Sequence, residues 1–190
     1  MLNDVLTFLK TSLNHHLRIN GGAVEPQEEQ VVFITGQNAE TLTLKLGAVS
    51  MLLVRIEQEK ILRAPDLYQR KLADGSTAST QPEIRLDLYV LFAAHYTQYE
   101  DRLRNLSAIL WYFQEHHLIT HQNAPDLSQN IQQLVLELMT LSFAEQNEIW
   151  GSLRLPYHPC LLYKVKMVVY QADAQPSAAL VGDIVLGVQA

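Results

Sequence analysis

The chain has 190 residues, of which 48% are hydrophobic and only 18% are charged, and its formal net charge is -6. This length can bury one substantial core, so we expect one domain with appendages. The acidic balance, without a Lys or Arg cluster, excludes a dedicated nucleic-acid-binding protein. A single cysteine, Cys160, suits a reducing compartment. No apolar run approaches the ~20 residues that span a bilayer, and the N-terminus lacks the regions of a signal peptide, so we expect a soluble cytosolic product without membrane contact.

The N-terminal part is predicted to form one helix followed by strands. Apolar residues at spacings of three and four over 2–17 indicate an amphipathic helix that ends at the Asn-Gly-Gly run 20–22 and packs on a sheet. Strands are predicted over 31–35 and over 42–56, where Gly47 either separates two strands or bends one. The small, polar, turn-rich segment 73–82 is predicted to be a mobile loop of the same domain.

The middle of the chain contains the strongest predicted strand, over 84–96, with alternate residues on two faces and an apolar second half that favours a central position. Thr97 and Glu100 have capping-box spacing and predict the start of a helix. Its apolar face is predicted to comprise Tyr99, Leu103, Leu106, Leu110 and Phe113, and its end to lie near His117.

After that helix the pattern is less decisive. An extended piece is predicted over 118–122 and a turn over 123–126, whereas 131–141 fits both a strand and a helix.

The stretch 141–170 combines a helix start, a turn and a strand. Ser142 and Glu145 form a second capping-box pattern, so a helix should begin at Phe143 with Phe143, Trp150 and Leu153 on its apolar face. The two prolines in 155–159 end the helix. A strand should follow with one apolar face.

These elements predict an α+β domain with a single mixed β-sheet and helices packed against it. We place the domain at 1–172 and treat 173–190 as a C-terminal extension or an edge strand. The residues predicted to be core are Trp150, Tyr157, Tyr163, Phe92, Leu106 and Phe113.

Candidate chemistry is sparse, so we predict no enzyme, no cofactor and no metal. His117 and His121 have zinc-binding spacing only if one helix carries both, and the helix should end there. Cys160 beside His158 offers a thiol and a base, but a strand start does not position them for proton transfer. No phosphate loop, dinucleotide fingerprint or nucleophile elbow is present.

Three regions are candidates for protein contact, and the first is the predicted loop over 73–82. Trp111, Tyr112 and Phe113 are consecutive, so a helix cannot turn all three inward, and exposed aromatic residues often anchor interfaces. The tail 180–188 is apolar and could add a strand to a neighbour's sheet edge, or form the last edge strand of its own sheet.

Three stretches, 52–65, 84–127 and 136–170, together resemble the N-terminal domain of the cap proteins of extracellular contractile injection systems of the antifeeding-prophage class. The motifs are L-Y-x-L-F-A, L-x-x-L-S-A-x-x-x-x-F-Q, L-S-F-x-E-x-N-x-x-W-G-x-L and Y-x-P-x-x-x-Y-K-V. The family is similar in role to the tail terminators of contractile phages.

The resemblance implies a phage tail-terminator-like fold and a non-enzymatic cap subunit. Such subunits form a six-fold ring on the inner tube and sheath and fix particle length, in a bacterial particle that is assembled in the cytoplasm and can be released from the cell. A baseplate or sheath-associated adaptor is the alternative. The residues assigned to contacts are Asp74, Ser76, Thr77, Trp111, Tyr112, Leu180, Val181, Ile184, Val185, Leu186 and Val188.

Overall fold

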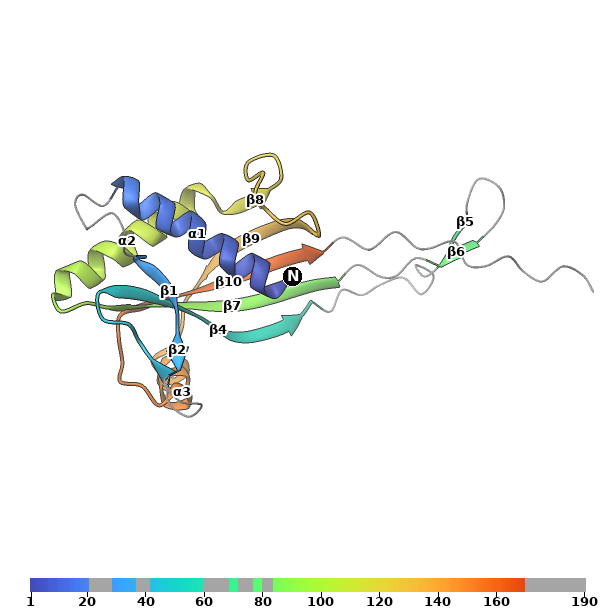
Figure 1. The fold of residues 1–190 in the computed structure, drawn as a ribbon. Coiled ribbons are helices and arrows are strands. Elements are labelled where there is room, and N and C mark those ends of the chain that lie inside the picture. Colours follow the sequence, from blue (N-terminus) through green and yellow to red (C-terminus); the bar gives the residue numbers. More distant parts are fainter. Residues whose placement is uncertain (21–28, 37–41, 60–68, 72–76, 80–83, 170–190) are drawn as a thin grey trace, which may run out of the picture. The chain divides into compact units, whose positions relative to one another are not determined.

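The computed structural model describes residues 1–20, 29–36, 42–59, 69–71, 77–79 and 84–169 (Figure 1). The chain divides into two compact units, of which the first comprises 1–60 and 84–170 and the second 61–83 and 171–190. The described part of the second unit is one antiparallel pair of strands, β5 (Gln69–Lys71) and β6 (Thr77–Ser79).

Part of the loop predicted over 73–82 is a strand, because Thr77–Ser79 pairs in register with Gln69–Lys71. The rest of that segment lies outside the described residues, and its predicted mobility stays a prediction. Asp74 and Ser76 lie outside the described residues, as does the whole tail from 170 to 190.

The first unit is built on a six-stranded sheet in the order β1-β4-β7-β10-β9-β8. Its strands are β1 (Val31–Phe33), β4 (Ala48–Gln58), β7 (Ile84–His95), β8 (Leu118–Thr120), β9 (Ile131–Met139) and β10 (Cys160–Val169). The β1–β4 pair is parallel and the other neighbours are antiparallel, so this sheet is mixed, as predicted. A small second sheet joins β2 (Thr35–Gly36) to β3 (Leu42–Thr43). Gly47, with φ +81°, separates β3 from β4, which settles the alternatives of two strands or one.

Helices cover both faces of the sheet (Figure 1). The helices α1 (Leu2–Asn20) and α2 (Tyr99–Glu115) lie over one face, and α3 (Phe143–Leu153) lies over the other. The strand β7 is therefore buried on both sides, with Phe92 in the larger core under α1 and α2 and Leu91 in the smaller core under α3. This explains why its second half is apolar at every position.

One amide ties α1 to the edge of the sheet. The Asn14 side chain donates to the Val31 carbonyl oxygen at 2.8 Å and accepts from the Val31 N–H at 2.9 Å. Both backbone groups of an edge residue are thereby satisfied, which fixes β1 against the helix.

The capping box of α3 forms as predicted. The Glu145 N–H donates to Ser142 Oγ at 3.3 Å, and the Ser142 N–H donates to Glu145 Oε2 at 2.8 Å. The box predicted at Thr97 and Glu100 is wrong, because α2 begins one residue later, with Gln98 as the N-cap and no side-chain cap.

The predicted apolar face of α2 is also partly wrong. Leu106, Ile109 and Phe113 are buried, whereas Tyr99 and Leu103 are 61% and 44% exposed. Arg102, one turn before Leu106, donates from Nε to the Tyr96 carbonyl oxygen at 2.8 Å. In the first turn of α2 an arginine, and not an apolar residue, therefore occupies the position that faces inward. The helix is thus rotated away from the face that spacing alone selected.

The ambiguous segment 131–141 is the strand β9, because it pairs with β10 on one side and β8 on the other. Among the predicted core residues, Phe92, Leu106, Phe113, Trp150 and Tyr163 are buried. Tyr157 is 60% exposed, so its assignment to the core is wrong. It follows Pro156 in an irregular segment, and its ring meets that of Trp150 in T-shaped geometry. Phe143 is 92% exposed and takes no part in the apolar face of α3.

Two phenylalanines provide a matched test of the core. Replacing Phe92, which is fully buried, with alanine should lower the free energy of unfolding by ~3–5 kcal/mol, because both the transfer energy and the packing around the ring are lost. Phe143→Ala should change it by less than ~0.5 kcal/mol. Urea unfolding followed by circular dichroism measures both. Equal losses in the two variants would contradict the assigned burial.

Candidate interaction surfaces

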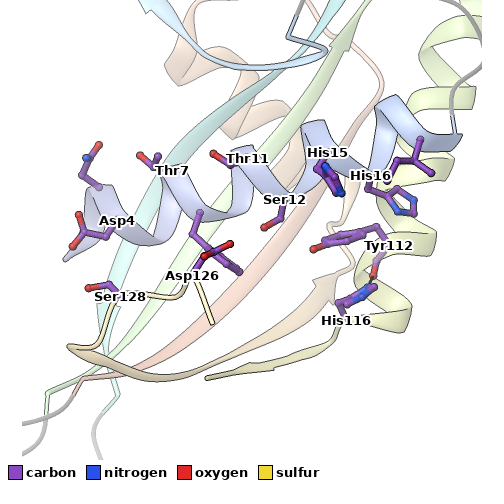
Figure 2. Close-up of a pocket in the computed structure, with 13 residues that line it drawn as sticks. Asp4, Thr7, Thr11, Ser12, His15, His16, Tyr112, His116, Asp126 and Ser128 are labelled. Carbon is purple, nitrogen blue, oxygen red and sulfur yellow. Dashed lines mark hydrogen bonds between the residues drawn. The ribbon is translucent and has the colours of Figure 1, made fainter. Parts of the chain in front are cut away.

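An open groove of about 890 Å³ runs along α1 (Figure 2). One wall is the polar side of α1, and the other is formed by α2 and the turn before β9, which contribute Tyr112, His116, Asp126 and Ser128. The groove thus combines hydroxyl groups along its length with aromatic and imidazole rings where α2 approaches α1.

The aromatic part of the groove is packed by ring contacts. Tyr112 stacks on His116 with ring centroids 4.5 Å apart and lies 4.9 Å from the ring of His16. Burial lowers the pKa of His16, and Glu115 opposes this shift. Burial raises the pKa of Tyr112. The neutral forms of His16 and Tyr112 are therefore favoured.

The predicted pair Trp111 and Tyr112 divides between two environments. Trp111 is 65% exposed, whereas Tyr112 is half-buried between the two helices. With Tyr99 and Leu103, Trp111 forms the outer flank of α2, which we define by these three residues. These are the exposed large apolar side chains of a helix whose Leu106, Ile109 and Phe113 are buried in the core.

The outer half of the other sheet face is charged instead of apolar. Lys164 pairs with Asp87 at 2.8 Å, Lys166 with Glu137 at 2.6 Å, and Tyr89 donates to Glu57 at 2.7 Å. The hydrogen bond with Asp87 raises the pKa of Lys164. These cross-strand pairs give the face a polar surface beyond the end of α3.

The histidines and the cysteine weighed as catalytic or metal candidates do not assemble into a site in the described part of the chain. Because α2 ends at Glu115, His117 and His121 do not share a helix, and the His121 ring lies 2.8 Å from the Ile131 carbonyl oxygen. Burial raises the pKa of the Cys160 thiol, which disfavours the nucleophilic thiolate. Among the described residues, no three His, Cys, Asp or Glu side chains are grouped as a metal would require.

His158 lies beside another histidine instead of a catalytic partner. Its ring centroid is 4.7 Å from that of His95, and its buried Nδ1 has no hydrogen-bond partner in the described part of the chain. Burial lowers the pKa of His158, and His95 and Arg102 lower it further.

The remaining predicted contact residues stay predictions. Thr77 is in β6, but its side chain is not described, and the residues of the tail lie outside the described ranges. The exposure of Tyr99 and Leu103 was missed, because periodicity identifies an apolar face but not which part of it the sheet covers. Among the described residues, no helix has the length and apolar character needed to cross a membrane.

Comparison with known proteins agrees with this architecture. The family model described as the Pvc16 N-terminal domain matches residues 4–182. The fold is similar to that of the PVC sheath/tube terminator of an extracellular contractile injection system in its extended state, with a TM-score of 0.57 and 14% identity over 100% of this chain and 64% of that one. It is also similar to the tube terminating cap of the anti-feeding prophage, with a TM-score of 0.50 and 15% identity over 74% of this chain and 49% of that one. The chain thus spans less than two thirds of either structure's length, and no curated protein sequence matches it.

The histidine pair predicts a loss of stability in acid. Since the pKa of His158 is below its ordinary value of 6.5 in the folded state, the unfolded chain binds more protons below that pH. The contribution of neutral, buried His158 to the free energy of unfolding is fully present above about pH 6.5. It is lost as the pH falls through the pKa that His158 has in the folded state. Thermal unfolding near pH 7.5 and pH 5.5 should show a smaller acid shift in His158→Gln than in the wild type. The exposed His117→Gln is the control, and equal shifts in both variants would refute the assignment.

Proposed function

Because the chain belongs to the Pvc16 N-terminal domain family, we propose that it is a structural cap subunit of a contractile, phage-tail-like injection particle. In this proposal several copies, six by the resemblance of the sequence, form a ring at the distal end. The ring contacts the inner tube and the sheath, stops their polymerisation and so fixes particle length. The chain acts without catalysis, in a particle assembled in the bacterial cytoplasm.

The observation that carries the proposal is the match to a tube terminator over the whole chain, together with the family assignment. The surface is compatible with it. The outer flank of α2 exposes two aromatic residues and a leucine, the residue types that supply interface anchors. The Cys160 thiol and the separated histidines give no support to an enzymatic role.

A sheath-associated or baseplate adaptor of the same particle is the second candidate, since such a subunit would also need exposed apolar anchors. The position of the chain along the particle separates the two. Electron microscopy of particles that carry a tagged chain should place the tag at the distal end only.

Deletion of the gene should give particles of irregular length, because nothing would stop tube and sheath growth. Length distributions from negative-stain micrographs measure this, and re-expression of the wild-type chain should restore a narrow distribution. Particles of normal, uniform length after deletion would refute the cap function.

Trp111→Ala should weaken capping without weakening the fold, because the side chain is 65% exposed in the isolated chain. We expect a loss of ~1–2 kcal/mol in subunit binding, or roughly 5- to 30-fold in affinity, and a change in unfolding free energy within ~0.5 kcal/mol. The fraction of capped particle ends is the readout. Leu46→Ala, at 59% exposure in the segment between β3 and β4, is the control and should cap normally.

A further inference from the structure

The outer edge of β9 is only partly covered. The short strand β8 pairs with Gln133–Val135, and the Leu136 N–H then donates to the His117 carbonyl oxygen at 2.8 Å. Beyond Leu136, no described residue makes a backbone hydrogen bond to this edge. The last residues of β9 are therefore an open strand edge.

Leu138 is the residue that this edge presents. Backbone groups of alternate residues point toward opposite neighbours, so Leu138 directs its N–H and C=O outward as Leu136 does. Its side chain is 49% exposed. Leu138 is the cross-strand partner of Tyr163, which is buried in the core under α1 and α2, so the Leu138 side chain lies on the sheet face that α2 covers.

The edge and the outer flank of α2 thus offer complementary groups on one side of the sheet. Leu138 supplies unpaired backbone groups, and Tyr99, Leu103 and Trp111 supply exposed apolar surface. An extended apolar segment satisfies both requirements, because strand addition provides main-chain hydrogen bonds while alternate side chains cover the apolar groups.

The opposite edge of the sheet is longer, but it carries features that oppose pairing with another strand. On β4 the register shifts at Val54, and Arg55 and Glu57 form an ion pair beyond the end of β1. Bulges and charges of this kind oppose strand addition. We therefore assign the acceptor role to β9.

We propose that the tail 180–188 of a neighbouring copy of this chain pairs with the outer edge of β9 at Leu138. The inference rests on the proposed ring. In a ring every contact joins two different surfaces of the same subunit, and a tail on a sheet edge is such a contact. In an extended tail the even positions, Leu180, Gly182, Ile184, Leu186 and Val188, form one wholly apolar face, while the only charge, Asp183, lies on the other.

The neighbour's tail is a better donor than the chain's own. Tyr163, opposite Leu138, is six residues from Val169, where β10 ends, which corresponds to ~20 Å along the sheet. The ten residues 170–179 span at most ~36 Å when fully extended. Within one chain they would also have to pass around β8 and the turn 121–130 before residue 180 reached the edge. A tail from a second copy has no such detour.

Disulfide trapping between purified full-length chains tests the contact. All chains carry Cys160→Ala; one preparation adds Leu138→Cys, and the other adds one cysteine in the tail. Equal amounts are mixed, oxidised mildly and separated on a non-reducing gel. Cysteine at Ile184 or Leu186 should give at least about fivefold more linked dimer of the two preparations than cysteine at Val185, because neighbouring strand residues point to opposite faces.

Two outcomes would overturn the inference: no excess of dimer at the even positions, or disulfides that form only within one chain in a double variant and not in mixtures.

A second measurement needs no cysteine. Leu138→Arg should lower the assembled fraction in analytical ultracentrifugation at least about threefold, whereas Ile56→Arg, on the β4 edge at 47% exposure, should leave it unchanged. If the Leu138→Arg variant assembled to the same fraction as the wild type, that result would also count against the contact. Both measurements use purified chains without particles, so a negative result counts against the tail contact alone. The cap function is refuted by a different result, normal particle length after gene deletion.

Discussion

The packing of three aromatic rings determines how α2 sits on the sheet. Phe113 of α2 lies 4.7 Å from Tyr163 of β10 and 5.6 Å from Phe92 of β7, between ring centroids, in tilted or edge-on geometry. Such pairs are more favourable than their buried area alone suggests. With Phe113 turned toward the sheet, Leu106 and Ile109 follow it inward. The residues of the outer flank are then left exposed, so the surface available for contact is a consequence of the core.

The two faces of the sheet differ in how their side chains are shielded from water. On the face covered by α1 and α2, the strands contribute most of the larger core, and Leu138, an exposed apolar residue described on this face, lies at its margin. On the other face α3 covers one end, and paired charges such as Lys164 with Asp87 occupy the rest. Since charges on a strand face disfavour sheet-to-sheet association, we expect apolar contacts at the flank of α2 and the edge of β9 instead.

The sequence predicted most elements because local rules decide them. The box at Ser142, the glycine at Gly47 and the alternation in β7 each act within a few residues. It failed where a distant contact decides. Spacing placed Tyr99 and Leu103 on the apolar face of α2, but both are exposed. The observed rotation follows from the packing of Phe113 against the rings of Phe92 and Tyr163. The same limit explains Tyr157, whose burial depended on where a turn directs it. The exposure of Leu138 was equally hidden, because it follows from the point at which β8 ends.

A comparison of free energies indicates why the outer flank of α2 would not hold a ring of subunits together by itself. Full burial of a large apolar side chain contributes ~1.5–3 kcal/mol, so three partly exposed side chains supply at most ~5–9 kcal/mol. Association costs an estimated ~4–15 kcal/mol in lost translational and rotational freedom, which can cancel that gain. A subunit contact therefore needs a second source of affinity, and an unpaired strand edge beside the flank supplies it through main-chain hydrogen bonds. In a closed ring each copy would make this contact twice, once as donor and once as acceptor, so the loss of freedom of one subunit is offset by two interfaces.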